Sequence, residues 1–372
     1  MKKLLFIPFL FLFIYACNSN DEGTVVNTGD SFDRSVMLKN WADNIIIPSF
    51  QNYQNKVNAF KNDVDAFTAS PNQLKLEAVR ASWLQAYRAY QSVGMFGVGK
   101  ATEIHFVSAT NTYPTDTVGI EANISSGTYD FSAISQFSKQ GFPALDFMLY
   151  GLAADDNALL DFYIGNVNAS KYKDYLNNLV TRLKFNADLI VSHWNTTYRN
   201  EFVASSQNTP SSSTNLMVNT FVNYYERQIR AGKVGIPSGV FSTGTLFPTK
   251  TEAYYKNNIS KLLLQDAVNA SSDFFNGKHF AHNASGSSLK SYIEHLNVSK
   301  NGVSLVTIIN DQFTACNSKI AVLNDSFSVE LNANKLKMLE TYDQLQKNVQ
   351  YFKVDMMAAL NISVDYADAD GD

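Results

Sequence analysis

The chain has 372 residues, of which 45% are hydrophobic, so it is long enough to form one large domain or two ordinary ones. Its 34 acidic residues outnumber its 30 lysines and arginines, the formal net charge is −4, and no run of basic residues is present. This balance argues against a nucleic-acid partner, because such proteins gain affinity from clustered basic side chains that contact phosphates.

The N-terminus has the pattern of a lipoprotein signal. Lys2 and Lys3 precede an apolar run over residues 4–14, which is too short to span a bilayer, and the motif "IYAC" follows. A small residue, Ala16, directly before Cys17 predicts cleavage before Cys17 and acylation of its sulfur and amine. Residues 1–17 are therefore predicted to be a lipoprotein signal peptide and lipobox, with a lipid anchor to the membrane; an ordinary buried cysteine in an uncleaved anchor is the alternative.

The segment after Cys17 predicts a flexible tether over residues 18–30. Its sequence, "NSNDEGTVVNTGD", is polar and has nothing to bury. We predict an outer membrane lipoprotein, and the acidic pair Asp21 and Glu22 leaves a cell-surface location and a periplasm-facing one both open. Once Cys17 is lipidated, Cys316 is the only other cysteine, so the mature chain has no internal disulfide and depends on its core for stability.

Helical periodicity runs through almost the whole mature chain. Apolar residues recur at spacings of three and four from Trp41 to Phe67, with Pro48 as a predicted kink, and again from Val79 to Tyr90. Three later stripes follow the same spacing, namely Leu176, Leu179, Leu183, Ile190 and Trp194; Val306, Ile309, Phe313, Cys316, Ile320 and Leu323; and Leu339, Tyr342, Leu345, Val349, Phe352 and Met356. The stripe from Val306 to Leu323 places Cys316 on a core face. Strands are expected to be incidental at most.

The predicted fold is all-α, with two packed four-helix-bundle-like halves. Clusters of Gly, Ser, Thr, Asn and Pro, such as "VGMFGVGK" and "AGKVGIPSGVFSTGT", separate the helices. We place an N-terminal helical bundle at residues 31–168 and a C-terminal helical bundle at residues 169–372, with an approximate boundary.

Histidine motifs give little evidence of metal chemistry. The sequence has five histidines and no H-E-x-x-H motif. The "HFAH" stretch, His279 to His282, would place two imidazoles on one face of a helix, but its flanks indicate a loop and a solvated surface pair. The "EIH" stretch, Glu103 to His105, is either part of a pocket or an ordinary loop salt bridge or cap.

The tail "DYADADGD" brings four aspartates together, Asp365, Asp368, Asp370 and Asp372. A calcium loop would need a bidentate Glu at its twelfth position, and the sequence ends before that position. A solvated acidic end is therefore the default interpretation, with a calcium site as the alternative.

The stretch "QGFPALDFMLYG", Gln140 to Gly151, predicts a short helix with Pro143 at its first position and a stop at Gly151. Together with "NTYPTDTVGIEANI", "GKVGIP" and the closing "YADADGD", it resembles the imelysin family of bacterial envelope proteins, which are often lipoproteins and are linked to iron acquisition. The resemblance covers most of the mature chain. It implies two helical halves with a pocket between them.

The family's hallmark motif, G-x-H-x-x-E, is only partly kept. Gly141 matches its glycine, but Pro143 stands at the histidine position and Asp146 at the glutamate position. Proline offers no side-chain ligand, and a carboxylate without its imidazole is a poor transition-metal site. Asp146 is either a first-turn acid that the helix dipole favours or a pocket residue.

The resemblance also implies which segments line the pocket. One wall would come from the Gly141 segment and the other from Gly232, Lys233, Gly235 and Pro237; Glu103 and His105 are the further pocket residues that we would test. No catalytic residue is assigned, and the metal ligands are unknown.

Three functions follow from these observations. The preferred one is a non-enzymatic binding lipoprotein that assists iron or haem uptake through the pocket, with iron or haem as its ligand and iron-uptake or outer-membrane components as partners. A metal-dependent peptidase, the activity that the family label implies, is the second, and Pro143 argues against it. A surface interaction protein without a small ligand is the third.

Overall fold

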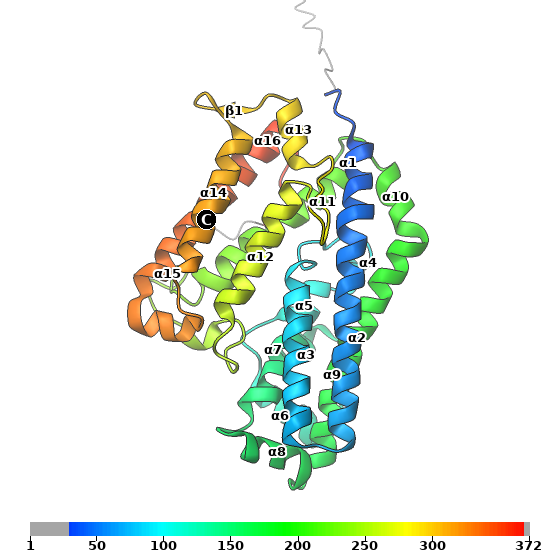
Figure 1. The fold of residues 1–372 in the computed structure, drawn as a ribbon, viewed down its shortest axis with the longest axis vertical. Coiled ribbons are helices and arrows are strands. Elements are labelled where there is room, and N and C mark those ends of the chain that lie inside the picture. Colours follow the sequence, from blue (N-terminus) through cyan, green and yellow to red (C-terminus); the bar gives the residue numbers. More distant parts are fainter. Residues whose placement is uncertain (1–29, 368–372) are drawn as a thin grey trace, which may run out of the picture. The chain divides into compact units, whose positions relative to one another are not determined.

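The computed structural model describes residues 30–367, so the predicted signal peptide with Cys17, most of the tether, and Asp368, Asp370 and Asp372 lie outside the described residues. From Phe32 onward the chain forms one compact unit. Almost every element in it is helical, which confirms the all-α prediction (Figure 1). No helix among residues 30–367 combines the length and apolar character that crossing a membrane requires.

Three long helices, α2 (Ile47–Ala69), α3 (Gln73–Gln91) and α9 (Ala169–His193), dominate the first group of elements (Figure 1). α2 packs along both α3 and α9, while α7 and α8 pack on α9. The elements of this part, in chain order, are α1 (Arg34–Asn40), η1 (Trp41–Ile46), α2 (Ile47–Ala69), α3 (Gln73–Gln91), α4 (Lys100–Glu103), α5 (Phe106–Asn111), α6 (Thr117–Ser126), η2 (Ile134–Lys139), α7 (Gly141–Asp146), η3 (Phe147–Gly151), α8 (Asp156–Ile164), α9 (Ala169–His193), η4 (Trp194–Tyr198) and α10 (Arg199–Ala204).

A second group of helices packs around α15 (Phe327–Gln350). There α15 contacts η5 (Tyr225–Gly235) and α14 (Leu305–Ala321), and α12 (Ser260–Phe275) contacts α14, η5 and also α3 of the first group. The remaining elements are α11 (Ser213–Tyr224), η5 (Tyr225–Gly235), η6 (Pro248–Lys250), α12 (Ser260–Phe275), α13 (Leu289–His295), β1 (Ser299–Lys300), β2 (Val303–Ser304), α14 (Leu305–Ala321), α15 (Phe327–Gln350), η7 (Tyr351–Met356) and α16 (Met357–Ala359). The paired strands β1 and β2 are two residues each, as expected for incidental strands.

The helix boundaries follow local chemistry. α3 begins after the Ser70-Pro71 break, where the Asn72 side chain caps the helix by accepting a hydrogen bond from the Lys75 backbone N–H at 3.0 Å. The π-helical segment η1 ends directly before α2. Pro48, where the sequence predicts a kink, lies in the first turn of α2. α9 packs on α2 and so belongs to the first group. The predicted boundary between two bundles, at residues 168 and 169, stays a prediction.

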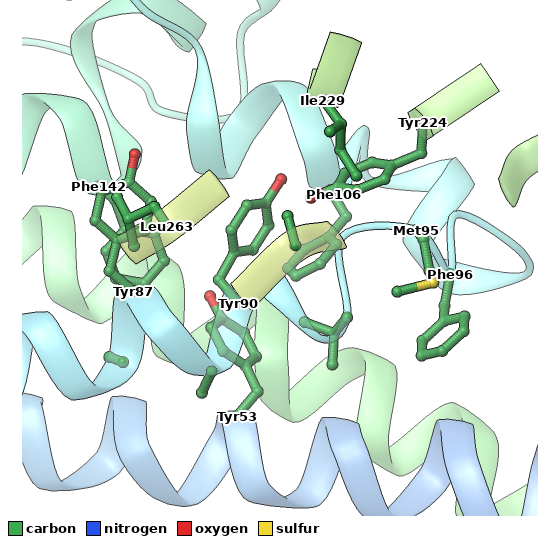
Figure 2. Close-up of a cluster of buried hydrophobic side chains, with 14 of the residues drawn as sticks. Tyr53, Tyr87, Tyr90, Met95, Phe96, Phe106, Phe142, Tyr224, Ile229 and Leu263 are labelled. Atoms are coloured by element: carbon green, nitrogen blue, oxygen red, sulfur yellow. The ribbon is translucent and has the colours of Figure 1, made fainter. Parts of the chain in front are cut away.

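The predicted apolar stripes are buried, except at the start of the last one, where Leu339 and Tyr342 are half-buried and Met338 takes the core position. Cys316 lies on the inner face of α14 and is fully buried, and burial raises the pKa of its thiol to about 11. Figure 2 shows a cluster of buried side chains to which both groups contribute, including Tyr87 of α3, Phe142 of α7 and Leu263 of α12. The rings of Tyr87 and Phe142 are stacked, with centroids 4.5 Å apart. This shared core lies beside the site described next.

Candidate functional site

The motif glycine is required by a close approach of two segments. Gly141 opens α7 with φ +77°, and a Cβ atom there would lie 2.2 Å from the carbonyl oxygen of Thr110 in α5. α7 starts at Gly141, so Pro143 is its third residue, and the prediction that Pro143 takes the first helical position is wrong by two residues. The helical segment continues through η3 to Gly151, where the predicted stop is confirmed.

Asp146 is the last residue of α7, so a role for it in the first turn of the helix is wrong. Its side chain is buried, and its two carboxylate oxygens accept hydrogen bonds from the backbone N–H groups of Tyr255 and Lys256, at 2.8 and 2.9 Å. Burial raises the pKa of this carboxyl to about 7, and these two hydrogen bonds oppose the rise. Asp146 therefore fastens α7 to the segment before α12.

Asp146 and Pro143 do line a cavity, but that cavity is small. It measures about 30 Å³ and is shared with Tyr113 and Tyr255. A space of this size holds about one water molecule. The motif position thus leaves no room for a larger ligand.

Glu103 and His105 lie elsewhere. Glu103 ends α4, is exposed, and pairs with Lys100, whose hydrogen bond lowers the pKa of the carboxyl. His105 is exposed in a left-handed backbone conformation at φ 52°, and it lines a cavity of about 300 Å³ that includes Tyr366. The structure therefore does not bring Glu103, His105 and Asp146 into one cavity.

The segment from Gly232 to Gly235 belongs to the π-helix η5, although the sequence predicts a loop there. A Cβ atom on Gly232 would lie 3.2 Å from the Tyr113 hydroxyl, and one on Gly235 would lie 2.7 Å from the Phe241 ring. Pro237 follows η5 and is buried, and its carbonyl accepts a hydrogen bond from the Phe247 N–H at 2.9 Å. Lys233 points inward.

Lys233 and Glu252 form a buried ion pair at the centre of a polar network. Their side chains are 2% and 1% exposed. The Lys233 ammonium also donates to Gln91 Oε1 at 2.9 Å, while Asn111 Nδ2 and the Tyr87 hydroxyl donate to Glu252 Oε1 at 2.7 and 3.1 Å. Burial lowers the pKa of Lys233, and the attraction of Glu252 opposes this effect. The network joins α3, α5, η5 and the segment before α12.

A larger pocket opens next to this network, between α5 and η5, and we call it the α5–η5 pocket. Its volume is about 350 Å³, within the range of small-ligand sites. Its lining consists of Val107, Ser108, Asn111, Thr112, Tyr113, Pro114, Arg227, Gln228, Gly232, Ile236 and Lys250. Asn111 belongs to both the pocket wall and the buried network, so the ion pair lies directly behind this wall.

The charge of the α5–η5 pocket is positive. Its lining includes Arg227 and Lys250 but no carboxylate. Arg227 is exposed and donates a hydrogen bond to the Ala367 carbonyl, and the Lys250 ammonium lies 3.9 Å from the centroid of the Phe247 ring. Such a lining favours an anionic ligand.

A catalytic metal does not fit the motif position. Pro143 has no ligand atom, and both oxygens of Asp146 are already engaged by backbone N–H groups. No group of three or more His, Cys, Asp and Glu side chains within residues 30–367 could hold a metal ion. The motif position therefore offers no complete set of side-chain ligands for a metal ion.

Several residues of the site are not predicted from the sequence. Glu252, Asn111 and Tyr87 meet through tertiary contacts, and the irregular segment around Glu252 has no periodicity that would reveal its burial. A signal did exist for Tyr113, because it lies in the "NTYPTDTVGIEANI" segment that supports the family resemblance.

The fold and the site define an all-α protein with two packed helix groups, a buried Lys–Glu pair and a basic pocket beside that pair. The family model described as Imelysin, Peptidase_M75, matches residues 46–355. The chain therefore belongs to the imelysin family, which confirms the resemblance. A comparison with curated proteins found no match.

Two solved structures share the fold. One is a protein assigned as an iron-regulated protein A precursor from Parabacteroides distasonis, with a TM-score of 0.71, 16% identity, and coverage of 88% of this chain and 95% of that one. The other is an imelysin-like protein from Psychrobacter arcticum, with a TM-score of 0.62, 15% identity, and coverage of 90% and 97%.

Proposed function

We propose that this imelysin-family protein is a non-enzymatic binding lipoprotein that takes an anionic iron chelate or haem into the α5–η5 pocket and so assists iron or haem uptake. The observation that carries the proposal is the pocket lining, which has Arg227 and Lys250 and no carboxylate. Chelates such as ferric citrate, and the propionates of haem, present carboxylates that these two cations can pair with.

The form of the iron follows from the donor groups. Free ferric iron prefers to be coordinated by several oxygen ligands at once. Residues 30–367 contain no cluster of three or more acidic, His or Cys side chains that could coordinate it. A chelate brings its own iron ligands, and the protein then needs only to recognise the charge and shape of the chelate. The iron-regulated protein from Parabacteroides distasonis, which shares the fold, adds a link to iron.

The proposed location is the outer membrane, with the lipid anchor at Cys17 and the helical unit on the periplasmic side or at the cell surface. Iron-uptake or outer-membrane components are the partners to which a tethered binder would deliver its ligand. Radiolabelled palmitate incorporation into the full chain, lost in the Cys17→Ala variant, tests the anchor.

The ligand is tested by elemental analysis and absorption spectroscopy. The chain from Asn18 onward, which keeps every described residue, would be incubated separately with ferric citrate, haemin and ferric chloride and then desalted. We expect stoichiometric iron after ferric citrate, or a Soret band after haemin, and no retained iron after ferric chloride. A colourless, iron-free protein in all three cases would contradict the proposal and favour a surface interaction protein.

A further inference from the structure

A second cavity lies between α2, α3 and α12, and the loop over residues 276–287 closes one end of it. We call it the α2–α12 groove. Its volume is about 550 Å³, and it shares no lining residue with the α5–η5 pocket. The "HFAH" stretch, which the proposed function does not use, is in its lining.

The loop that carries the two histidines is held firmly in place. The Asn40 side chain donates a hydrogen bond to the Ser287 carbonyl at 3.0 Å, and the Phe280 N–H donates to the Asn44 carbonyl at 2.8 Å. Within the loop, the His279 N–H donates to the Ala284 carbonyl at 2.9 Å. The loop is thus anchored to α1 and η1, and its position at the groove is fixed.

Each carboxylate in the groove lining is already paired. Asp266 of α12 forms a double contact with Arg88 of α3, at 2.7 and 3.1 Å, and Asp273 accepts from the Lys278 ammonium at 3.2 Å. The Arg88–Asp266 pair links α3 to α12, and the Asp273–Lys278 pair links the end of α12 to the loop that follows it. Within each pair the positive and negative charges cancel.

Three further side chains of the lining are basic, namely Lys56 of α2, His279 and His282. Within residues 30–367, none of these three side chains makes a hydrogen bond or ion pair with another residue. After the two wall pairs are accounted for, Lys56 leaves the groove with an excess positive charge, and the two imidazoles add N–H donors.

The floor of the groove is apolar. Ile45, Phe96 and Phe274 line it, and the rings of Phe96 and Phe274 meet edge to face with centroids 5.4 Å apart. We propose that the α2–α12 groove binds an amphipathic organic anion, a carboxylate with an aliphatic or aromatic body. The carboxylate pairs with Lys56 and the imidazoles, and the body lies on the apolar floor.

The test compares octanoate with octanol, which has the same body without the charge. Isothermal titration calorimetry would use the chain from Asn18 onward. Octanoate should bind about fivefold more tightly than octanol, and Lys56→Met should remove this difference while it leaves octanol binding unchanged. Lys335→Met, at an exposed lysine outside both cavities, is the matched control and should change neither affinity.

Two groove-filling variants test the location. Asn52→Trp and Ala270→Trp each place a large side chain in the lining, and each should abolish octanoate binding while the thermal unfolding transition stays cooperative. If one variant fails to fold, the other gives the result. The proposal would be overturned by equal affinities for octanoate and octanol, by no effect of Lys56→Met, by binding that survives in a folded groove-filling variant, or by no binding of octanoate.

Discussion

The buried pair of Lys233 and Glu252 gives the sharpest test of how the site is held together. In Glu252→Gln the side chain keeps its shape, and its carbonyl oxygen can still accept from Asn111 and Tyr87. The Lys233 ammonium, whose side chain is 2% exposed, then has no opposite charge beside it. Removal of one partner from a buried ion pair costs about 3–5 kcal/mol of unfolding free energy, and we expect a loss in this range.

The assay is urea unfolding followed by tryptophan fluorescence, with a double-mutant cycle. Lys233→Met should also lose about 3–5 kcal/mol, whereas the double variant should lose at least about 2 kcal/mol less than the sum, because it leaves no unpaired charge. Lys319→Met, at the exposed pair with Glu340, is the control and should cost less than about 1 kcal/mol. Additive losses for Glu252→Gln and Lys233→Met would show that the two side chains do not interact as a buried ion pair.

Three further predictions concern single residues. The pKa of Asp146 rises from 3.8 to about 7 on folding, so the native state binds its proton more tightly than the unfolded state does. The unfolding free energy should therefore fall by about 2–3 kcal/mol as the pH rises from 5 to 8. Urea unfolding of Asp146→Asn should lack this pH-dependent contribution. Gly141→Ala should cost more than about 2 kcal/mol of unfolding free energy, since its Cβ would meet the Thr110 carbonyl. Gly127→Ala, which has φ +70° but open space around it, should cost about 1 kcal/mol. Thermal melts would rank the two variants. The buried Cys316 thiol, with its pKa raised to about 11, should react with Ellman's reagent at pH 8 only after unfolding; fast reaction in the native state would contradict its burial.

The sequence predicted the helices well because their signal is local. An apolar residue every three or four positions, as from Val306 to Leu323, marks a buried helical face whatever it packs against. The stop at Gly151 was likewise predicted from one residue. The start of α7 was not, since Gly141 begins the helix through its close approach to Thr110, and that contact comes from another part of the chain.

The site itself could be predicted only in part. Gly141, Pro143 and Asp146 were recognised through the motif, but the partners of Asp146 are backbone N–H groups about 110 residues away in sequence, which no pattern reveals. Lys233 was placed at the pocket, yet its burial against Glu252 depends on how η5 packs. Tertiary packing decided these contacts.

The proposed function depends on Arg227 and Lys250 holding an anionic iron chelate in the α5–η5 pocket. The most direct measurement is a calorimetric titration of ferric citrate into the chain from Asn18 onward and into the Arg227→Gln/Lys250→Gln variant, with Lys335→Gln as the control. We expect the double variant to bind at least about tenfold more weakly and the wild-type affinity to fall as salt rises, while the control is unchanged. Equal affinity in the wild type and the double variant would contradict the claim.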